Sequence, residues 1–256
     1  MIGEIRIMNI FLTYAFMFSV GSTLGWGLEV VFRRFFSRKN PERKWVNPGF
    51  LNGPYLPLYG FGLCALYTMT MLENIIFIDN ELISQLVLFV MMAAAMTLIE
   101  YIAGIIFIKG MKTQLWDYSD ERGNIQGIIC PKFSFFWAVL SAVYYFLIHP
   151  YVLGGIQWLS DNLAFSFVIG LFFGVFLVDV TYSLDLLVKI RRFAADNDIV
   201  VLYERLKNEV RSKADKYRKR DKIHYFLLTF HAGKSINEVL QEHLQNNKDD
   251  KRSKYK

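Results

Sequence analysis

Long apolar stretches, interrupted by short polar segments, dominate the chain before residue 190. Five of these stretches approach or exceed the roughly 20 residues that an α-helix needs to cross a bilayer. We place the predicted membrane-spanning helices at residues 10–32, 56–76, 82–108, 133–148 and 163–188. The pattern therefore predicts an all-α membrane helix bundle over residues 1–190, followed by a basic, helical cytoplasmic tail over residues 191–256.

The composition agrees with a membrane protein, because 54% of the residues are hydrophobic, whereas soluble domains have about 45–50%. The first stretch lacks the basic start and the small-residue cleavage site of a signal peptide, so we expect it to stay in the protein. The two cysteines, Cys64 and Cys130, are far apart, and their spacing predicts neither a disulfide framework nor a zinc site.

Lysine and arginine are placed unevenly along the chain, and this predicts its orientation. Of the 29 basic residues, all except Arg6 lie in or beside the first loop, the third loop or the tail. Loops rich in lysine and arginine stay in the cytoplasm. We therefore expect an N-terminus outside and a C-terminus in the cytoplasm, which requires an odd number of crossings.

The first two helices resemble the next two, which suggests a pair of parallel repeats with the fifth helix appended. Glu29 and Glu100 each precede a basic loop. Each loop then ends in a segment with Asn, Gly and Pro in the same order, at residues 47–54 and 124–131, before an aromatic-rich helix. Transporters are often built from such repeats, although chance similarity of short segments is the alternative.

Three acidic residues lie within the predicted spans, where carboxylates are costly and usually paired or functional. At about 1.5 Å rise per residue, Asp179 lies roughly 15 Å before Lys189, and Glu100 lies roughly 13 Å before Lys109. Glu29 is nearer the cytoplasmic boundary. One interpretation is a polar cavity in which Glu29, Glu100 and Asp179 bind a cation, a proton or a cationic substrate group. The alternative is structural, with each acid hydrogen-bonded inside the bundle to Tyr, Ser, Trp or Arg.

The first and third loops carry a second group of candidate residues. Glycine and proline break the apolar run near residue 50, as in a segment that re-enters the membrane or lies at its surface. In the third loop we expect Asp117 to form an Asx-turn with Ser119 or with backbone amides. The loop candidates are Asn47, Gly49, Gly53, Pro54, Trp116, Asp117, Tyr118 and Asn124.

Two pairs of glycines at a spacing of four residues are typical of close helix contacts in membranes. They are Gly21 with Gly25 in the first span and Gly170 with Gly174 in the fifth. The spacing predicts that another helix approaches closely at each pair.

Several of these motifs together resemble the putative ABC-transporter type IV family (CmpB-like), which occurs in bacterial membranes. The resemblance covers about residues 10–190. It is carried by Gly25-Trp26 with Glu29, Asn-x-Gly-Phe-Leu-x-Gly-Pro at 47–54, the aromatic and glycine residues of 57–62, Glu100, Trp-Asp-Tyr-Ser at 116–119, and Asn124 with Gly127. It implies a multi-pass permease-like protein of the bacterial cell membrane, with no catalytic residues to carry over.

A transport protein of unknown substrate is thus the main functional prediction, and we expect no enzyme activity, cofactor or metal. The sequence has no P-loop, so an ABC-type role would need a separate ATP-binding subunit. Further expected partners are the lipid bilayer, another cytoplasmic protein or a second copy of the chain, but no nucleic acid. Two alternatives remain open: a scaffold or regulator acting through its tail, and a lipid-modifying enzyme using Asn47, Asp117, Ser119 and Asn124.

Overall fold

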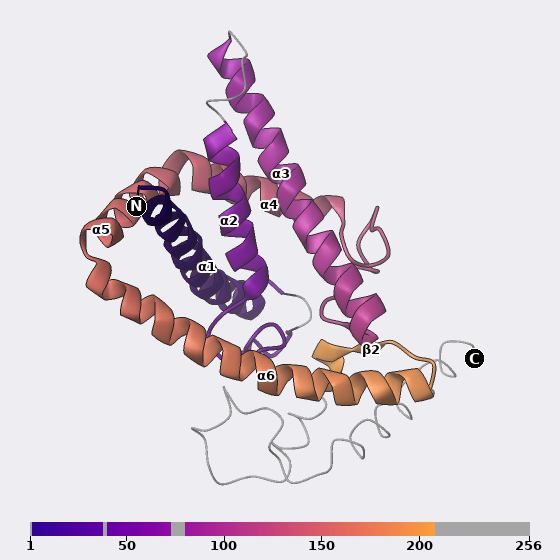
Figure 1. The fold of residues 1–256 in the computed structure, drawn as a ribbon. Helices are drawn as coiled ribbons and strands as arrows, with labels where there is room; N and C mark the ends of the chain where they lie inside the picture. The colour runs from indigo at the N-terminus through magenta and orange to yellow at the C-terminus, as the bar shows by residue number, and fades with distance from the viewer. Residues whose placement is uncertain (1, 38–39, 73–79, 208–256) are drawn as a thin grey trace.

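The computed structural model describes residues 2–37, 40–72 and 80–207, which are mainly helical (Figure 1). This confirms the all-α class predicted from the apolar pattern. In chain order, the elements are α1 (Ile2–Phe35), α2 (Pro57–Leu72), α3 (Glu81–Ile105), the π-helical turn η1 (Ile106–Gly110), β1 (Thr113–Gln114), α4 (Pro131–Val143), the π-helical turn η2 (Tyr144–Ile148), α5 (His149–Asp161), the 3₁₀ turn η3 (Leu163–Phe165), α6 (Ser166–Asp196) and β2 (Val201–Leu202).

Four helical segments of the described chain are long and apolar enough to cross a membrane. They are Ile10–Phe35, Leu82–Gly110, Pro131–Asp161 and Leu163–Asp196. The remaining apolar helix, α2, has 16 residues, or about 24 Å at 1.5 Å per residue. Residues 73–76, which complete the second predicted span, lie outside the described residues. The chain is thus a multi-pass membrane protein, and a fifth crossing stays a prediction.

Helices α1 and α2 pack against each other through glycine. A methyl group added at Gly25 would lie 2.2 Å from Cβ of Tyr59, and one at Gly21 would lie 2.8 Å from Cβ of Leu63. This confirms the predicted close approach at the first glycine pair. The prediction for the second pair is wrong, because an added methyl at Gly170 or Gly174 meets nothing within 4 Å among the described residues.

One apolar core of the bundle lies between α2, α3 and the α4–η2 segment. Its buried members are Leu66, Leu88, Met92, Met96, Trp137 and Tyr144. Elsewhere on these helices and on α6, large apolar side chains such as Leu98, Phe135 and Leu171 are exposed. Such outward-facing apolar surfaces on long helices are suited to lipid rather than to water.

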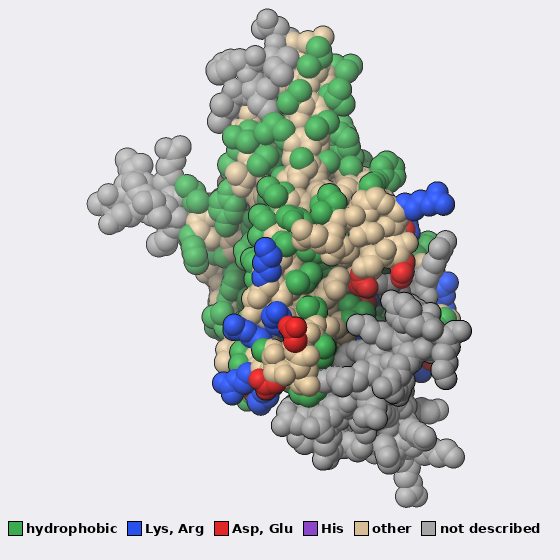
Figure 2. Space-filling model, turned by 90° about the vertical axis from the view of Figure 1, so that its right-hand side faces the viewer, with side chains coloured by type: hydrophobic (Ala, Val, Ile, Leu, Met, Phe, Trp, Pro, Cys, Tyr) green, Lys and Arg blue, Asp and Glu red, His purple; other side chains and the backbone are tan. Residues whose placement is uncertain are grey.

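Helix α6 crosses the other helices at a steep angle, as Figure 1 shows at the foot of α1, α2 and α3. As a result, the end of α6, the first loop (36–56) and the third loop (111–130) lie at one end of the bundle. We call this the basic end. Figure 2 shows charged side chains gathered there, while apolar side chains cover the rest of the visible face.

The segment after α6 folds back onto the basic end. Strand β2 pairs in parallel with β1, with Thr113 opposite Val201. Val201, Tyr203 and Leu206 are fully or almost fully buried, in one cluster with α6 residues such as Ile190. Only the start of the predicted helical tail is therefore described: α6 runs on to Asp196, a short strand follows, and residues 208–256 lie outside the described part.

Candidate functional site

The first loop is held together by Asn47, one of the predicted loop residues. Its side-chain carbonyl accepts a 2.7 Å hydrogen bond from Trp26 Nε1. Its amide nitrogen donates to the carbonyl oxygens of Leu51 (3.2 Å) and Asn52 (2.9 Å). Lys207 donates to the Asn47 carbonyl oxygen from the segment after α6, at 2.8 Å. Asn47 thus ties α1, its own loop and the chain after α6 together.

Asp179 binds the same loop from α6. It accepts hydrogen bonds from the backbone amides of Asn52 and Gly53 and from the Tyr55 hydroxyl, at 2.7–3.1 Å. Burial and the hydrogen bond to Asp179 raise the pKa of Tyr55, so its hydroxyl stays protonated and can donate. Helix α6 crosses the other helices at a steep angle, and Asp179 lies beside the first loop at the basic end.

The third loop has a parallel arrangement around Asn124 and Asp117. Asn124 donates to the Ser119 and Glu121 carbonyl oxygens and accepts from the Gly127 amide at 3.0 Å. Asp117 accepts a 2.9 Å hydrogen bond from the Ser119 amide, which confirms the predicted Asx-turn. Gly127 has φ +68°, a left-handed conformation that favours glycine. These contacts fix the loop that carries Trp116 and Tyr118.

Glu29 on α1 is bound on both of its carboxylate oxygens. Oε1 accepts from Arg33 at 2.8 Å, one helical turn further along, and Oε2 accepts from the Tyr59 hydroxyl of α2 at 3.0 Å. Arg33 also pairs with Glu204, from the segment after α6. Arg33 is therefore shared by two carboxylates that are widely separated in sequence.

Glu100 on α3 is also bound on both oxygens, but by neutral groups. Oε1 accepts from the Tyr118 hydroxyl and Oε2 from Trp137 Nε1, each at 3.0 Å. Burial and the nearby charges of Glu100 and Glu29 raise the pKa of Tyr118, so that hydroxyl remains a donor. Within the described chain, none of the five ion pairs includes Glu100.

Aromatic rings connect the surroundings of the two glutamates. The Tyr59 and Trp137 rings, which donate to Glu29 and Glu100 respectively, lie 5.1 Å apart between centroids. The Tyr118 ring stacks on Phe133 at 4.2 Å. The two carboxylates thus belong to one continuous group of side chains rather than to two separate sites.

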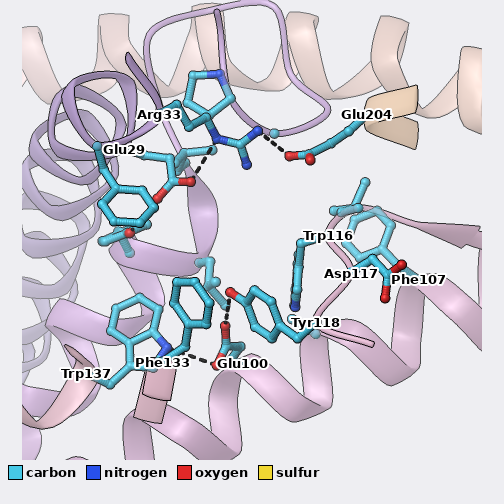
Figure 3. A pocket seen from close by; sticks show the side chains of 18 of the residues that line it. Glu29, Arg33, Glu100, Phe107, Trp116, Asp117, Tyr118, Phe133, Trp137 and Glu204 are labelled. Carbon is cyan, nitrogen blue, oxygen red and sulfur yellow. Dashed lines mark hydrogen bonds and ion pairs between the residues drawn. The ribbon is translucent and has the colours of Figure 1, made fainter. Parts of the chain in front are cut away.

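A cavity of about 980 Å³ lies between these groups at the basic end. In Figure 3, Arg33 lies between Glu29 and Glu204 on one side, and Glu100 lies with Tyr118 and Trp137 on the other. Of the residues singled out from sequence, those that line the cavity are Glu29, Gly49, Glu100, Trp116, Asp117 and Tyr118. Asn47, Gly53, Pro54, Asn124 and Asp179 are not among its described lining residues.

Sequence reasoning did not single out Arg33, Tyr59, Trp137 or Glu204, although all four line the cavity. For Arg33, the spacing of four residues from Glu29 on one helix was a usable signal. No such signal in the sequence marked Glu204, because its position depends on how the chain folds back after α6. A search of the described residues finds no group of three or more His, Cys, Asp or Glu side chains able to hold a metal ion.

The model of the putative ABC-transporter type IV family matches residues 16–184, more than half of the chain. The chain belongs to this family. The match includes Glu29, Glu100 and both loops, while Glu204 lies beyond it. Searches of curated proteins and of solved structures found no match. The family description points to a transporter-type membrane protein rather than to an enzyme.

Proposed function

We propose that this member of the ABC-transporter type IV family is the membrane-embedded part of a transport system, and that its cavity binds a cation or a cationic group of the substrate. One observation carries the proposal: a large cavity at the basic end contains a buried carboxylate, Glu100, that has no described cationic partner. An ionised carboxylate in a low-dielectric site is costly unless it is paired. A bound cation or a proton supplies the missing partner.

We further propose that the basic end faces the cytoplasm and that all five apolar segments cross the membrane. The uneven distribution of lysine and arginine supports this orientation. The meeting of the first loop, the third loop and the chain after α6 at one end is consistent with an odd number of crossings. In this arrangement the cavity lies at the cytoplasmic end of the bundle. A separate ATP-binding subunit, which ABC systems use as their energy source, would bind on the same side.

The proposed repeat gains support from the hydrogen bonds. In each half, a glutamate accepts from an aromatic side chain of the following helix, Tyr59 for Glu29 and Trp137 for Glu100. In each half, an asparagine, Asn47 or Asn124, organises the loop between the two helices. A cavity at the interface of two repeats is a common place for a transporter's substrate.

Transport assays with a neutral replacement of Glu100 test this function. The purified chain, with any ATPase that co-purifies from native membranes, is reconstituted in liposomes and given a panel of organic cations. We expect Glu100→Gln to lower the flux of the transported cation at least tenfold, or about 1.4 kcal/mol. The control is Asp185→Asn, which removes an exposed acid on α6 outside the cavity. Equal flux in wild type and Glu100→Gln contradicts the proposal.

A further inference from the structure

The charge of the cavity wall is strongly unbalanced. Among the described residues, those with acidic side chains that line it are Glu29, Glu100, Asp117, Asp120, Glu121 and Glu204, against two with basic side chains, Arg33 and Lys132. Both basic groups are already paired: Arg33 with Glu29 and Glu204, and Lys132 with Glu121 at 2.7 Å. The wall therefore favours a positively charged group over an anion.

The rest of the wall is apolar, and it continues onto the outer surface of the bundle. Phe61 on α2, Ile102 on α3 and Ile106 in η1 line the cavity, yet they are 59%, 48% and 58% exposed. All three lie on helices whose outer surface is suited to lipid. The cavity is therefore edged by exposed apolar side chains of these helices, and two of them, Ile102 and Ile106, follow the buried Glu100 closely in sequence.

A small, water-soluble cation would need only the acidic part of this wall. It would leave the apolar part, which includes Phe50, Phe107 and Phe133, without a contact. Contact with water is unfavourable for such an apolar surface, and a hydrocarbon chain that covers it keeps water away. A ligand with a positive head and a hydrocarbon chain satisfies both parts of the wall together.

We propose that the ligand of this cavity is a membrane amphiphile with an amine head group. The amine lies at Glu100, and the hydrocarbon chain passes Phe61, Ile102 and Ile106 toward the bilayer. This inference rests on the proposed function, because it identifies the substrate class of the same cavity. It goes beyond that function in assigning a lateral route from the membrane.

Quenching of tryptophan fluorescence by brominated amines tests the proposal, because Trp116 and Trp137 both line the cavity. The protein is placed in nanodiscs of zwitterionic lipid and titrated with 12-bromododecylamine, 4-bromobutylamine or 12-bromododecanoic acid. We expect saturable quenching by the long amine, at least tenfold weaker binding of the short amine, and no saturable quenching by the acid. Glu100→Gln should weaken binding of the long amine at least tenfold, and Asp185→Asn should not.

A second variant does not depend on replacing a buried group. Ile106→Phe places a larger side chain at the exposed edge of the cavity without adding a tryptophan to the fluorescence signal, and the amphiphile model expects it to weaken binding of the long amine but not of the short one. If both amines bind equally well and both depend on Glu100, the cavity binds a cation, but the proposal that its ligand is an amphiphile is wrong. If neither amine gives quenching that depends on Glu100, the cation site is overturned, and the proposed function with it.

Discussion

At the scale of single residues, Glu29 and Glu100 differ in the charge of their partners, although both accept two hydrogen bonds. Glu29 has Arg33 beside it, whereas the described donors to Glu100 are uncharged. We therefore assign ligand binding to Glu100 first and a positioning role to Glu29. Asp179 differs from both, because its partners are the backbone and side chains of the first loop.

Replacing Asp179 by asparagine tests how much its hydrogen bonds to the first loop stabilise the protein. One of the two carboxylate oxygens becomes an NH₂ donor. This removes the acceptor either of the Asn52 side-chain amide and the Ser183 hydroxyl, which donate to Oδ1, or of the Gly53 backbone amide and the Tyr55 hydroxyl, which donate to Oδ2. We expect the free energy of unfolding to fall by about 1–3 kcal/mol, measured as a lower thermal transition in detergent. The matched control, Asp185→Asn, breaks only an exposed pair with Lys189, and its effect should stay below about 0.5 kcal/mol. Equal shifts for the two variants would argue against a special role for Asp179.

At the scale of elements, the contact between α1 and α2 sets the position of Tyr59 and therefore of its hydrogen bond to Glu29. The contact depends on the absence of a side chain at Gly25. Helix α6 has the same spacing of glycines without a partner. Glycine spacing alone therefore did not distinguish a helix contact from a lipid-facing surface, because both tolerate small residues.

Two single alanine substitutions on α1 test the importance of this contact. Gly25→Ala adds a methyl that would collide with Tyr59 Cβ, an atom close to the backbone that moves only with α2. We expect a loss of about 1–3 kcal/mol. Gly27→Ala, two residues along, meets nothing within 4 Å and should be neutral or stabilising by up to about 1 kcal/mol. Thermal unfolding in nanodiscs compares them, and an unchanged Gly25→Ala protein would contradict the packing.

The pattern of apolar stretches predicted the helical class and the approximate places of the membrane helices, because hydrophobicity and length are local properties of the chain. It also indicated Glu29, Glu100 and Tyr118, since carboxylates in apolar helices and aromatic residues in loops are conspicuous. It could not predict the partners of Asp179, which depend on the inclination of α6. Nor did it predict the fold-back of Val201–Leu202 onto β1, because parallel pairing joins segments that are distant in sequence.

At the scale of the whole molecule, residues 199–207, which follow α6, contact both the first loop and the third loop. Lys207 and Tyr203 bond the first loop, strand β2 pairs with the third, and Glu204 reaches Arg33. The sequence favoured a separate tail, since charge increases sharply after residue 189. The structure instead makes the first part of that region an integral part of the cavity.

Two deletions separate these interpretations. Removing 196–256 takes away three buried apolar side chains, Val201, Tyr203 and Leu206, each worth about 1.5–3 kcal/mol on burial. We expect this variant to lose roughly 5 kcal/mol or more and to aggregate on size-exclusion chromatography in detergent. Removing 208–256 keeps every described contact, including those of Val201, Tyr203 and Leu206, so its thermal transition should lie well above that of the shorter protein. If both deletions behave alike, the fold-back contributes no stability.

The sharing of Arg33 by Glu29 and Glu204 also has a consequence for biosynthesis. The guanidinium and the second carboxylate are 171 positions apart, a stretch that a ribosome adds in roughly 10–30 s. During that interval the early helices are already entering the bilayer, while one wall of the cavity has not yet been translated. The contact of Glu204 with Arg33 is therefore among the last features of the cavity to form, and the cavity is complete only when insertion is almost finished.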